Sequence, residues 1–167
     1  MKRAARLLIS VGILTLAGCQ VRPLYSTGSG MEQTLASISI SEAKDRIEQK
    51  VRNSLIFLLG GGSGEPANPQ YRMELNVTST STGVLIDTVD DDDAARAGRI
   101  TVSADYNLAR TDTGETIRSG KRSVVALADF PIQEFAKVRA IRDAENRAAR
   151  ELAEVIRADI AASLSRR

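Results

Sequence analysis

Few side chains in this chain of 167 residues can act as nucleophiles or strong metal ligands. The sequence contains no histidine and a single cysteine, Cys19, so imidazole relays and metal sites of nitrogen and sulfur ligands are not expected. A pair of carboxylates, Glu74 and Asp105, remains as an enzyme-like alternative because the two residues fall in neighbouring predicted strands. Both belong to polar strand faces that need no catalytic explanation. We therefore predict no catalytic residue, no metal site and no enzymatic activity.

Cys19 follows a segment typical of export. Lys2, Arg3 and Arg6 precede the apolar run Leu7–Leu16, which is closed by Ala17 and Gly18. This order predicts a secretory signal peptide over residues 1–18, and the run is shorter than the ~20 residues of a spanning helix. The sequence Leu-Ala-Gly-Cys resembles the lipobox of bacterial lipoproteins, a resemblance that implies lipidation of the Cys19 thiol. The alternative is a buried free cysteine in an uncleaved segment, but an unpaired thiol is a liability in an exported protein. No cofactor is expected apart from this covalent lipid.

A second candidate site is the acidic run Asp90–Asp93. An EF-hand loop needs glycine at its sixth position and glutamate at its twelfth, and the chain offers neither whether the loop starts at Asp87 or at Asp90. The run is predicted to be a solvated hairpin tip, and adventitious divalent-cation binding is the alternative.

Charge excludes one large class of partners. Removal of residues 1–18 leaves 20 basic and 21 acidic residues, a net charge of −1, which does not support a nucleic-acid-binding protein. The remaining 149 residues or so suit one domain.

Apolar spacing predicts the elements of that domain. Residues 19–34 are expected to be a lipidated N-terminus and flexible tether, and residues 35–167 a single domain. A strand is predicted over 35–40, then a helix with Ser39 and Glu42 as capping box, ended by Gly60–Gly62. Strict alternation predicts strands over 71–78, 100–108 and 116–127, and a long helix follows over 132–164. The predicted apolar stripe of this helix consists of Val138, Ile141, Ala144, Ala148, Leu152, Val155 and Ile160. The fold class is α+β: a small, mostly antiparallel sheet of about four strands with two helices on one face, in the order β-α-β-β-β-α.

The run Cys19-Gln20-Val21-Arg22-Pro23-Leu24-Tyr25 resembles the Cys-Gly-Phe/Trp-x-Pro-Leu-Tyr pattern of the lipopolysaccharide-assembly lipoproteins of the LptE family, and the order of elements is similar. The resemblance implies a non-enzymatic lipoprotein of the outer membrane that plugs the LptD β-barrel, helps it assemble and assists lipopolysaccharide insertion. The resemblance to lipoproteins of the enteric type, which are held at the inner membrane by aspartate after the cysteine, implies that Gln20 permits transfer to the outer membrane, with the protein on the periplasmic side. Basic positions near the hairpin tip and at the entry of the last helix are implicated in lipopolysaccharide contact, which makes Lys137, Arg96 and Arg99 the candidates here. The alternative is an accessory lipoprotein of another envelope transport or secretion complex.

Overall fold

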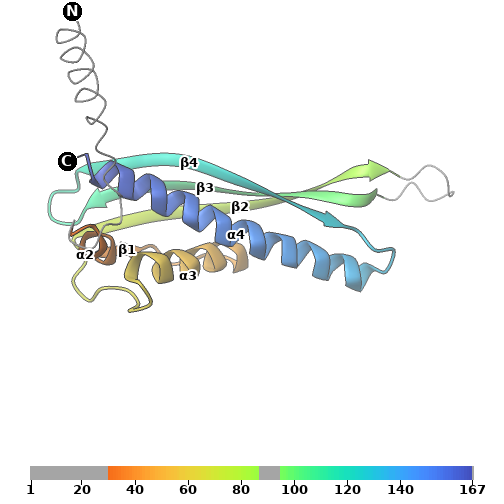
Figure 1. Ribbon diagram of the computed structural model, residues 1–167, viewed down its shortest axis with the longest axis horizontal. Coiled ribbons are helices and arrows are strands. Elements are labelled where there is room, and N and C mark those ends of the chain that lie inside the picture. The colour runs from red at the N-terminus through yellow and green to blue at the C-terminus, as the bar shows by residue number, and fades with distance from the viewer. Residues whose placement is uncertain (1–29, 87–94, 167) are drawn as a thin grey trace, which may run out of the picture.

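The computed structural model describes residues 30–86 and 95–166. Its elements, in chain order, are α2 (Met31–Ala36), β1 (Ile38–Ile40), α3 (Arg46–Gly60), β2 (Tyr71–Ile86), β3 (Ala95–Arg110), β4 (Thr116–Asp129) and α4 (Glu134–Leu164). Figure 1 shows one twisted sheet with the helices lying along it. The predicted α+β class is confirmed, with one short helix, α2, added before the first strand.

The sheet has the order β1-β2-β3-β4. Strand β1 runs parallel to β2 over three residues, whereas β2, β3 and β4 pair antiparallel along almost their whole lengths. Alternation along β2 and β3 places apolar side chains on the helix-covered face and mostly polar side chains on the other, as predicted. Strand β4 departs from this pattern, because Arg118 and Arg122 face α4 whereas Val125 and Leu127 lie on the open face. These strands extend beyond their predicted ends because hydroxyl-rich and alanine-rich flanks also suit a pleated backbone.

Helix α3 begins six residues, nearly two turns, after the position that the predicted capping box gave it. Its N-cap is Asp45, whose carboxylate accepts a hydrogen bond from the Glu48 amide at 2.9 Å. Asp45 therefore does what Ser39 was predicted to do, and Ser39 lies inside β1. The predicted glycine stop is confirmed: Gly61 adopts the left-handed conformation, with φ 57°, that lets the chain leave the helix.

Helix α4 is 31 residues long and packs through small side chains. Its buried residues are Ala144, Ala148, Ala149, Leu152, Ala153, Ile156, Ile160 and Ala161. The predicted stripe is wrong at Val138 and Val155, which are 43% and 37% exposed. The contact side follows the alanines instead, because small residues let the helix approach the sheet closely.

The segment predicted as a strand over 35–40 divides into two elements. Residues 31–36 form α2, which buries Met31 and Leu35, and only Ile38–Ile40 form strand. Six residues are too few to produce a helical period in the sequence, and Ala36 continues the alternation of Ile38 and Ile40 only by coincidence.

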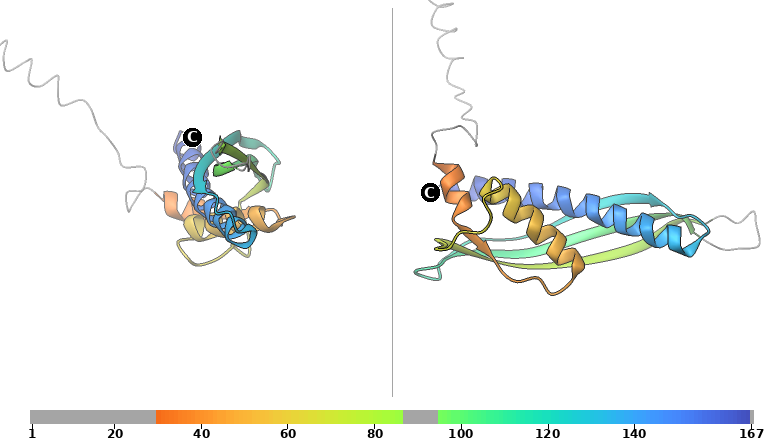
Figure 2. Two further views of the ribbon diagram at one scale, coloured as in Figure 1. Left: turned by 90° about the vertical axis from the view of Figure 1, so that its right-hand side faces the viewer. Right: turned by 90° about the horizontal axis from the view of Figure 1, so that it is seen from below.

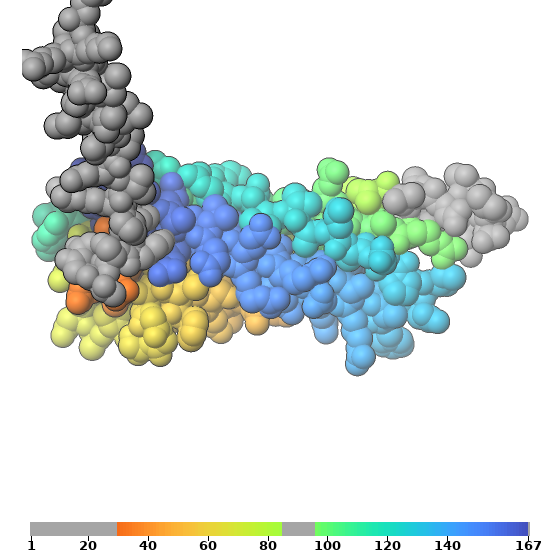
Figure 3. Space-filling view, in the orientation of Figure 1, coloured from red at the N-terminus to blue at the C-terminus, as the bar shows by residue number. Residues whose placement is uncertain are grey.

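The helices cover one face of the sheet, and the two ends of the molecule differ (Figures 1 and 2). We call the end with α2 and the last turns of α3 and α4 the α2 end, and the end with residues 82–86, 95–99 and 127–138 the hairpin end. Helix α4 runs between the two ends, whereas α3 lies only beside the part nearer the α2 end (Figure 3). Within residues 30–86 and 95–166, no helix combines the length and the apolar character needed to cross a bilayer.

Candidate functional site

The hairpin end is organised around Phe130, the residue that follows β4. Its ring is 7% exposed and lies over Gly98 of β3, where a Cβ atom would come within 1.8 Å of the ring. The Phe130 amide donates to the Arg96 carbonyl at 2.8 Å. A glycine in a strand marks a close approach of this kind, so Gly98 fixes where the chain turns from the sheet into α4.

Lys137 lies in the first turn of α4, beside this ring. Its Nζ is 5.6 Å from the centroid of the Phe130 ring and 3.6 Å from the Glu134 carboxylate. The Lys137 side chain is 34% exposed, so its methylene groups are sheltered and its ammonium reaches solvent. The ring face and one exposed carboxylate leave that ammonium able to pair with an external anion.

Arg96 and Arg99 lie close to Lys137 along the molecule but on opposite faces of β3. By alternation, Arg96 shares the helix-covered face with Gly98, whereas Arg99 lies on the open face in register with Thr82 and Leu127. The structure therefore brings Lys137 and Arg96 to either side of the Phe130 turn and leaves Arg99 behind the sheet. Of the other predicted sites, Cys19 and the run Asp90–Asp93 lie outside the described residues.

Exposed apolar side chains that sequence reasoning did not single out lie at the same end of the molecule, with Leu127 among them on the open face beside Arg99. Phe135 is 90% exposed, Ile132 75% and Leu127 65%. They come from β4, the β4–α4 turn and the first turn of α4, so they gather at one end of the molecule. The signal available in the sequence was Phe135, an aromatic residue at the polar start of a helix in a chain with only three phenylalanines.

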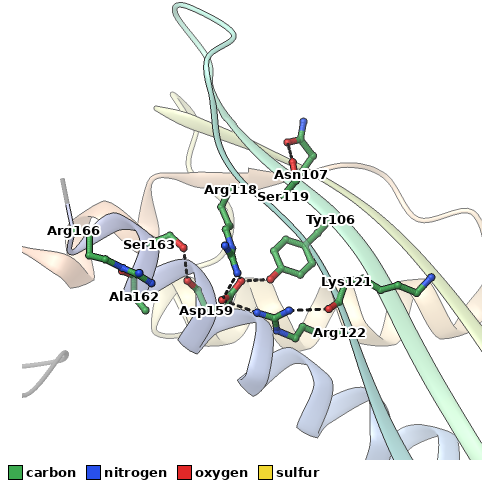
Figure 4. Close-up of polar contacts among 10 residues, drawn as sticks. All are labelled: Tyr106, Asn107, Arg118, Ser119, Lys121, Arg122, Asp159, Ala162, Ser163 and Arg166. Carbon is green, nitrogen blue, oxygen red and sulfur yellow. Dashed lines mark hydrogen bonds and ion pairs between the residues drawn. The ribbon is translucent and has the colours of Figure 1, made fainter.

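A charged cluster at the other end, which we call the Asp159 clamp, fastens α4 to the sheet (Figure 4). The Asp159 carboxylate accepts hydrogen bonds from Arg118 at 2.9 and 3.0 Å, from Arg122 at 2.8 Å and from the Tyr106 hydroxyl. Gly120 makes room for Tyr106, because a Cβ there would lie 2.6 Å from the hydroxyl oxygen. Sequence spacing could not reveal this cluster, since Tyr106 and Asp159 are 53 residues apart.

The clamp shifts the acidity of its members. Burial raises the pKa of Tyr106 to about 12, and the hydrogen bond to Asp159 adds to the effect. Burial alone would raise the pKa of Asp159, but the hydrogen bonds from Arg118 and Tyr106 and the charge of Arg122 together lower it. Near neutral pH the cluster is therefore one carboxylate held by two guanidinium groups and a neutral phenol.

The open face of the sheet is polar over most of its length, and the exposed side chains of Val125 and Leu127 interrupt it towards the hairpin end. Cross-strand rows on this face include Thr78 with Ser103 and Ser123, and Asn76 with Asp105 and Lys121. The Asp105 carboxylate, one of the two enzyme-like candidates, pairs with Lys121 at 3.2 Å and is exposed. Across the described parts of the chain, no cluster of three or more potential acidic or sulfur metal ligands occurs.

Comparison with known proteins places this fold. The profile of the lipopolysaccharide-assembly family LptE matches residues 33–160. The crystal structure of a putative lipoprotein from Caulobacter crescentus CB15 has 25% sequence identity and a TM-score of 0.66, and the match covers 81% of this chain and 96% of that one. The comparison with curated proteins found no match.

Two further solved structures share the fold at lower identity. The rare lipoprotein B of Shewanella oneidensis has 11% identity and a TM-score of 0.55, with 75% of this chain and 92% of that chain covered. A minor lipoprotein of Acinetobacter baumannii has 10% identity and a TM-score of 0.52, with 75% and 88% covered. With the profile match spanning most of the described residues, the chain belongs to the LptE family of lipopolysaccharide-assembly proteins.

Proposed function

We propose that this chain is an outer-membrane lipoprotein, held by lipid on Cys19, that occupies the lumen of the LptD β-barrel, helps the barrel assemble and assists lipopolysaccharide insertion at the cell surface. In this role the protein is not an enzyme: it positions a barrel and a lipid. Family membership alone does not establish these points: LptD as the partner, lipopolysaccharide as the bound lipid and the outer membrane as the location are what we propose.

The observation that carries the proposal is the polar open face of the sheet. Hydroxyl, amide and charged side chains of β2, β3 and β4 form most of it, with Thr78, Ser103 and Ser123 as one row. Val125 and Leu127 are its exposed apolar residues towards the hairpin end. The interior of a transmembrane barrel is polar, so a plug needs a polar surface where it meets the barrel wall. An extended, narrow molecule with such a face suits that position.

Lys137 is the residue that we assign to the anionic lipid. A positive charge in the first turn of a helix opposes the helix dipole, so helix stability does not account for a lysine at this place. Its ammonium is sheltered on one side by the Phe130 ring, and exposed apolar side chains such as Phe135 lie nearby in the chain. A cation next to apolar surface matches a ligand with both phosphate groups and acyl chains.

The partner is tested by isolating the full-length lipoprotein from detergent-solubilised envelopes and identifying the β-barrel that accompanies it. LptD is the expected barrel. Recovery of a different envelope complex would support the alternative role and contradict the proposal.

Lipid contact is tested with Lys137→Glu, and Lys44→Glu on the exposed β1–α3 loop is the matched control. We expect Lys137→Glu to weaken lipopolysaccharide binding while its Tm stays close to that of the wild type, and Lys44→Glu to bind normally. Equal binding by both variants would remove Lys137 from the site. The same measurement on Arg96→Glu and Arg99→Glu separates the two faces of β3.

A further inference from the structure

The backbone groups along the edges of this sheet differ in how they are hydrogen-bonded, and along one stretch of β2 they have no partner among the described residues. In β2, the Leu75 amide donates to the Ser41 hydroxyl at 3.1 Å, and this hydroxyl donates to the Leu75 carbonyl at 3.5 Å. The Met73 carbonyl accepts from the Ser41 amide at 2.9 Å. Odd-numbered residues of β2 therefore direct their backbone groups away from β3, because donors and acceptors alternate between neighbours in an antiparallel ladder. Strand β1 and Ser41 form hydrogen bonds with these backbone groups only as far as Leu75.

Beyond Leu75, residues 77–84 form what we call the open edge. Among the residues that the structure describes, no hydrogen bond reaches the edge-facing backbone groups of Val77, Ser79 and Ser81. Ser79 binds only through its side chain, which donates to Glu145 at 2.9 Å. The open edge is thus a row of unpaired donors and acceptors.

The other edges carry side-chain caps at some positions: among the described residues the edge-facing backbone groups of Ser123 and Val125 also have no partner, but the carbonyls on either side of them are capped. On β4, the Lys121 carbonyl accepts from Arg122 at 2.8 Å and the Leu127 carbonyl from Arg147 at 3.0 Å. On β1, the Ile40 amide donates to the Glu65 carboxylate at 3.1 Å. Caps and charged side chains are the usual means of preventing a free edge from pairing with another chain.

The open edge lacks charge as well as caps. Residues 75–86 contain no charged side chain, and Ser79–Thr82 is a run of hydroxyl residues. Hydroxyl side chains favour extended pairing across strands, and an uncharged edge leaves nothing to balance a charge on an incoming strand. Its natural ligand is an uncharged or hydroxyl-rich extended segment.

We propose that the open edge binds an extended segment of the β-barrel partner by strand addition, which makes that segment a fifth strand beside β2. This inference rests on the proposed function, because it takes the partner from it. Main-chain hydrogen bonds would provide the affinity, and the polar face of the sheet would continue onto the added strand.

A second copy of this chain fits the open edge less well. Two copies paired antiparallel at residue 81 would place their α2 ends on opposite sides, about 65 Å apart at 3.3 Å per residue. The chain from Cys19 to Gly30 spans at most about 40 Å, so two lipids in one bilayer could anchor such a pair only if its long axis lay nearly along the membrane, which does not suit the position inside a barrel lumen proposed above. A partner segment meets no such constraint.

The test uses the full-length lipoprotein co-expressed with the barrel and purified in detergent. Ser81→Pro removes an edge-facing N–H of β2, and the matched control Ser123→Pro removes an edge-facing N–H of β4. Proline is tolerated where the N–H faces away from the ladder. We expect Ser81→Pro to lower the recovered barrel about tenfold and Ser123→Pro to recover it like the wild type, with the same Tm for both variants.

Hydrogen exchange on the wild-type chain gives an answer even if Ser81→Pro fails to fold. We expect amide exchange in residues 77–84 to slow at least tenfold in the complex, and more than in residues 121–127. Equal recovery with both proline variants, or no selective slowing at 77–84, would overturn the proposal while the barrel partnership stands.

Two other outcomes are distinct. A wild-type chain that is dimeric without the barrel, with residues 77–84 already protected, would assign the edge to a second copy and overturn the proposal. A wild-type chain that recovers no LptD would contradict the proposed function itself, and this inference with it.

Discussion

At the α2 end, three helices pack on the sheet and enclose side chains such as Leu55 and Leu152, which have no solvent exposure. At the hairpin end, the first turn of α4 is the only helical cover among the described residues, and Phe135 and Ile132 remain 90% and 75% exposed. The chain thus encloses Leu55 and Leu152 at one end and leaves Phe135 and Ile132 in solvent at the other. We conclude that folding stability is concentrated at the α2 end.

The largest effect on this contrast is expected from Leu55→Ala. Its cavity lies between α3 and the rest of the core, so the free energy of unfolding should fall by about 3 kcal/mol in a urea titration. The control, Phe57→Ala, removes a larger side chain that is 65% exposed and should change stability by less than about 0.5 kcal/mol. Similar losses for both variants would contradict the assigned core.

Asp159→Ala should follow, because it opens the clamp. The Tyr106 hydroxyl and two guanidinium groups lose their common acceptor, and we expect a loss of about 2 kcal/mol in the same titration. Asp112→Ala is the control: Asp112 pairs with Arg110 at 3.0 Å on the surface, and its removal should leave the midpoint unchanged. Equal urea midpoints for Asp159→Ala and Asp112→Ala would mean that the clamp stabilises the fold no more than a surface ion pair does.

Gly98→Ala tests the one tightly packed point of the hairpin end. The new methyl group displaces the Phe130 ring, at an expected cost of about 1–2 kcal/mol in thermal unfolding. Combining it with Phe130→Ala gives the control, because the smaller side chain removes the clash and the two losses should not add. Additive losses would show that Phe130 does not lie on Gly98 in solution.

The smallest expected effect is the pH dependence of Tm. The lowered pKa of Asp159 means that its contribution is present above the carboxyl's ordinary pKa of 3.8 and is lost as pH falls below it. The raised pKa of Tyr106 acts at the other limit: its contribution is present below 10.0 and is lost as pH rises towards about 12. Asp159→Asn should flatten the acid limb and Tyr106→Phe the alkaline limb, whereas Lys137→Met at the hairpin end should leave both unchanged.

The sequence predicted most of the elements and little of what joins them. Alternation from Tyr71 to Thr78 and the glycine stop at Gly61 are local signals, and both predictions are confirmed. Pairing of Asp159 with Arg118 depends on how α4 crosses β4, which no local pattern contains. Gly98 and Gly120 were the missed clues, since a glycine within an alternating strand indicates that another group comes close.

The buried alanines of α4 limit the thickness of the molecule. Ala144, Ala148 and Ala153 contribute only methyl groups between the helix and the sheet, so the two layers lie as near to each other as side chains permit. Leucine at these places would force the layers apart and thicken the rod. The thickness of the protein, and with it the inner diameter of any ring that could receive it, depends on the methyl groups of the five buried alanines of α4.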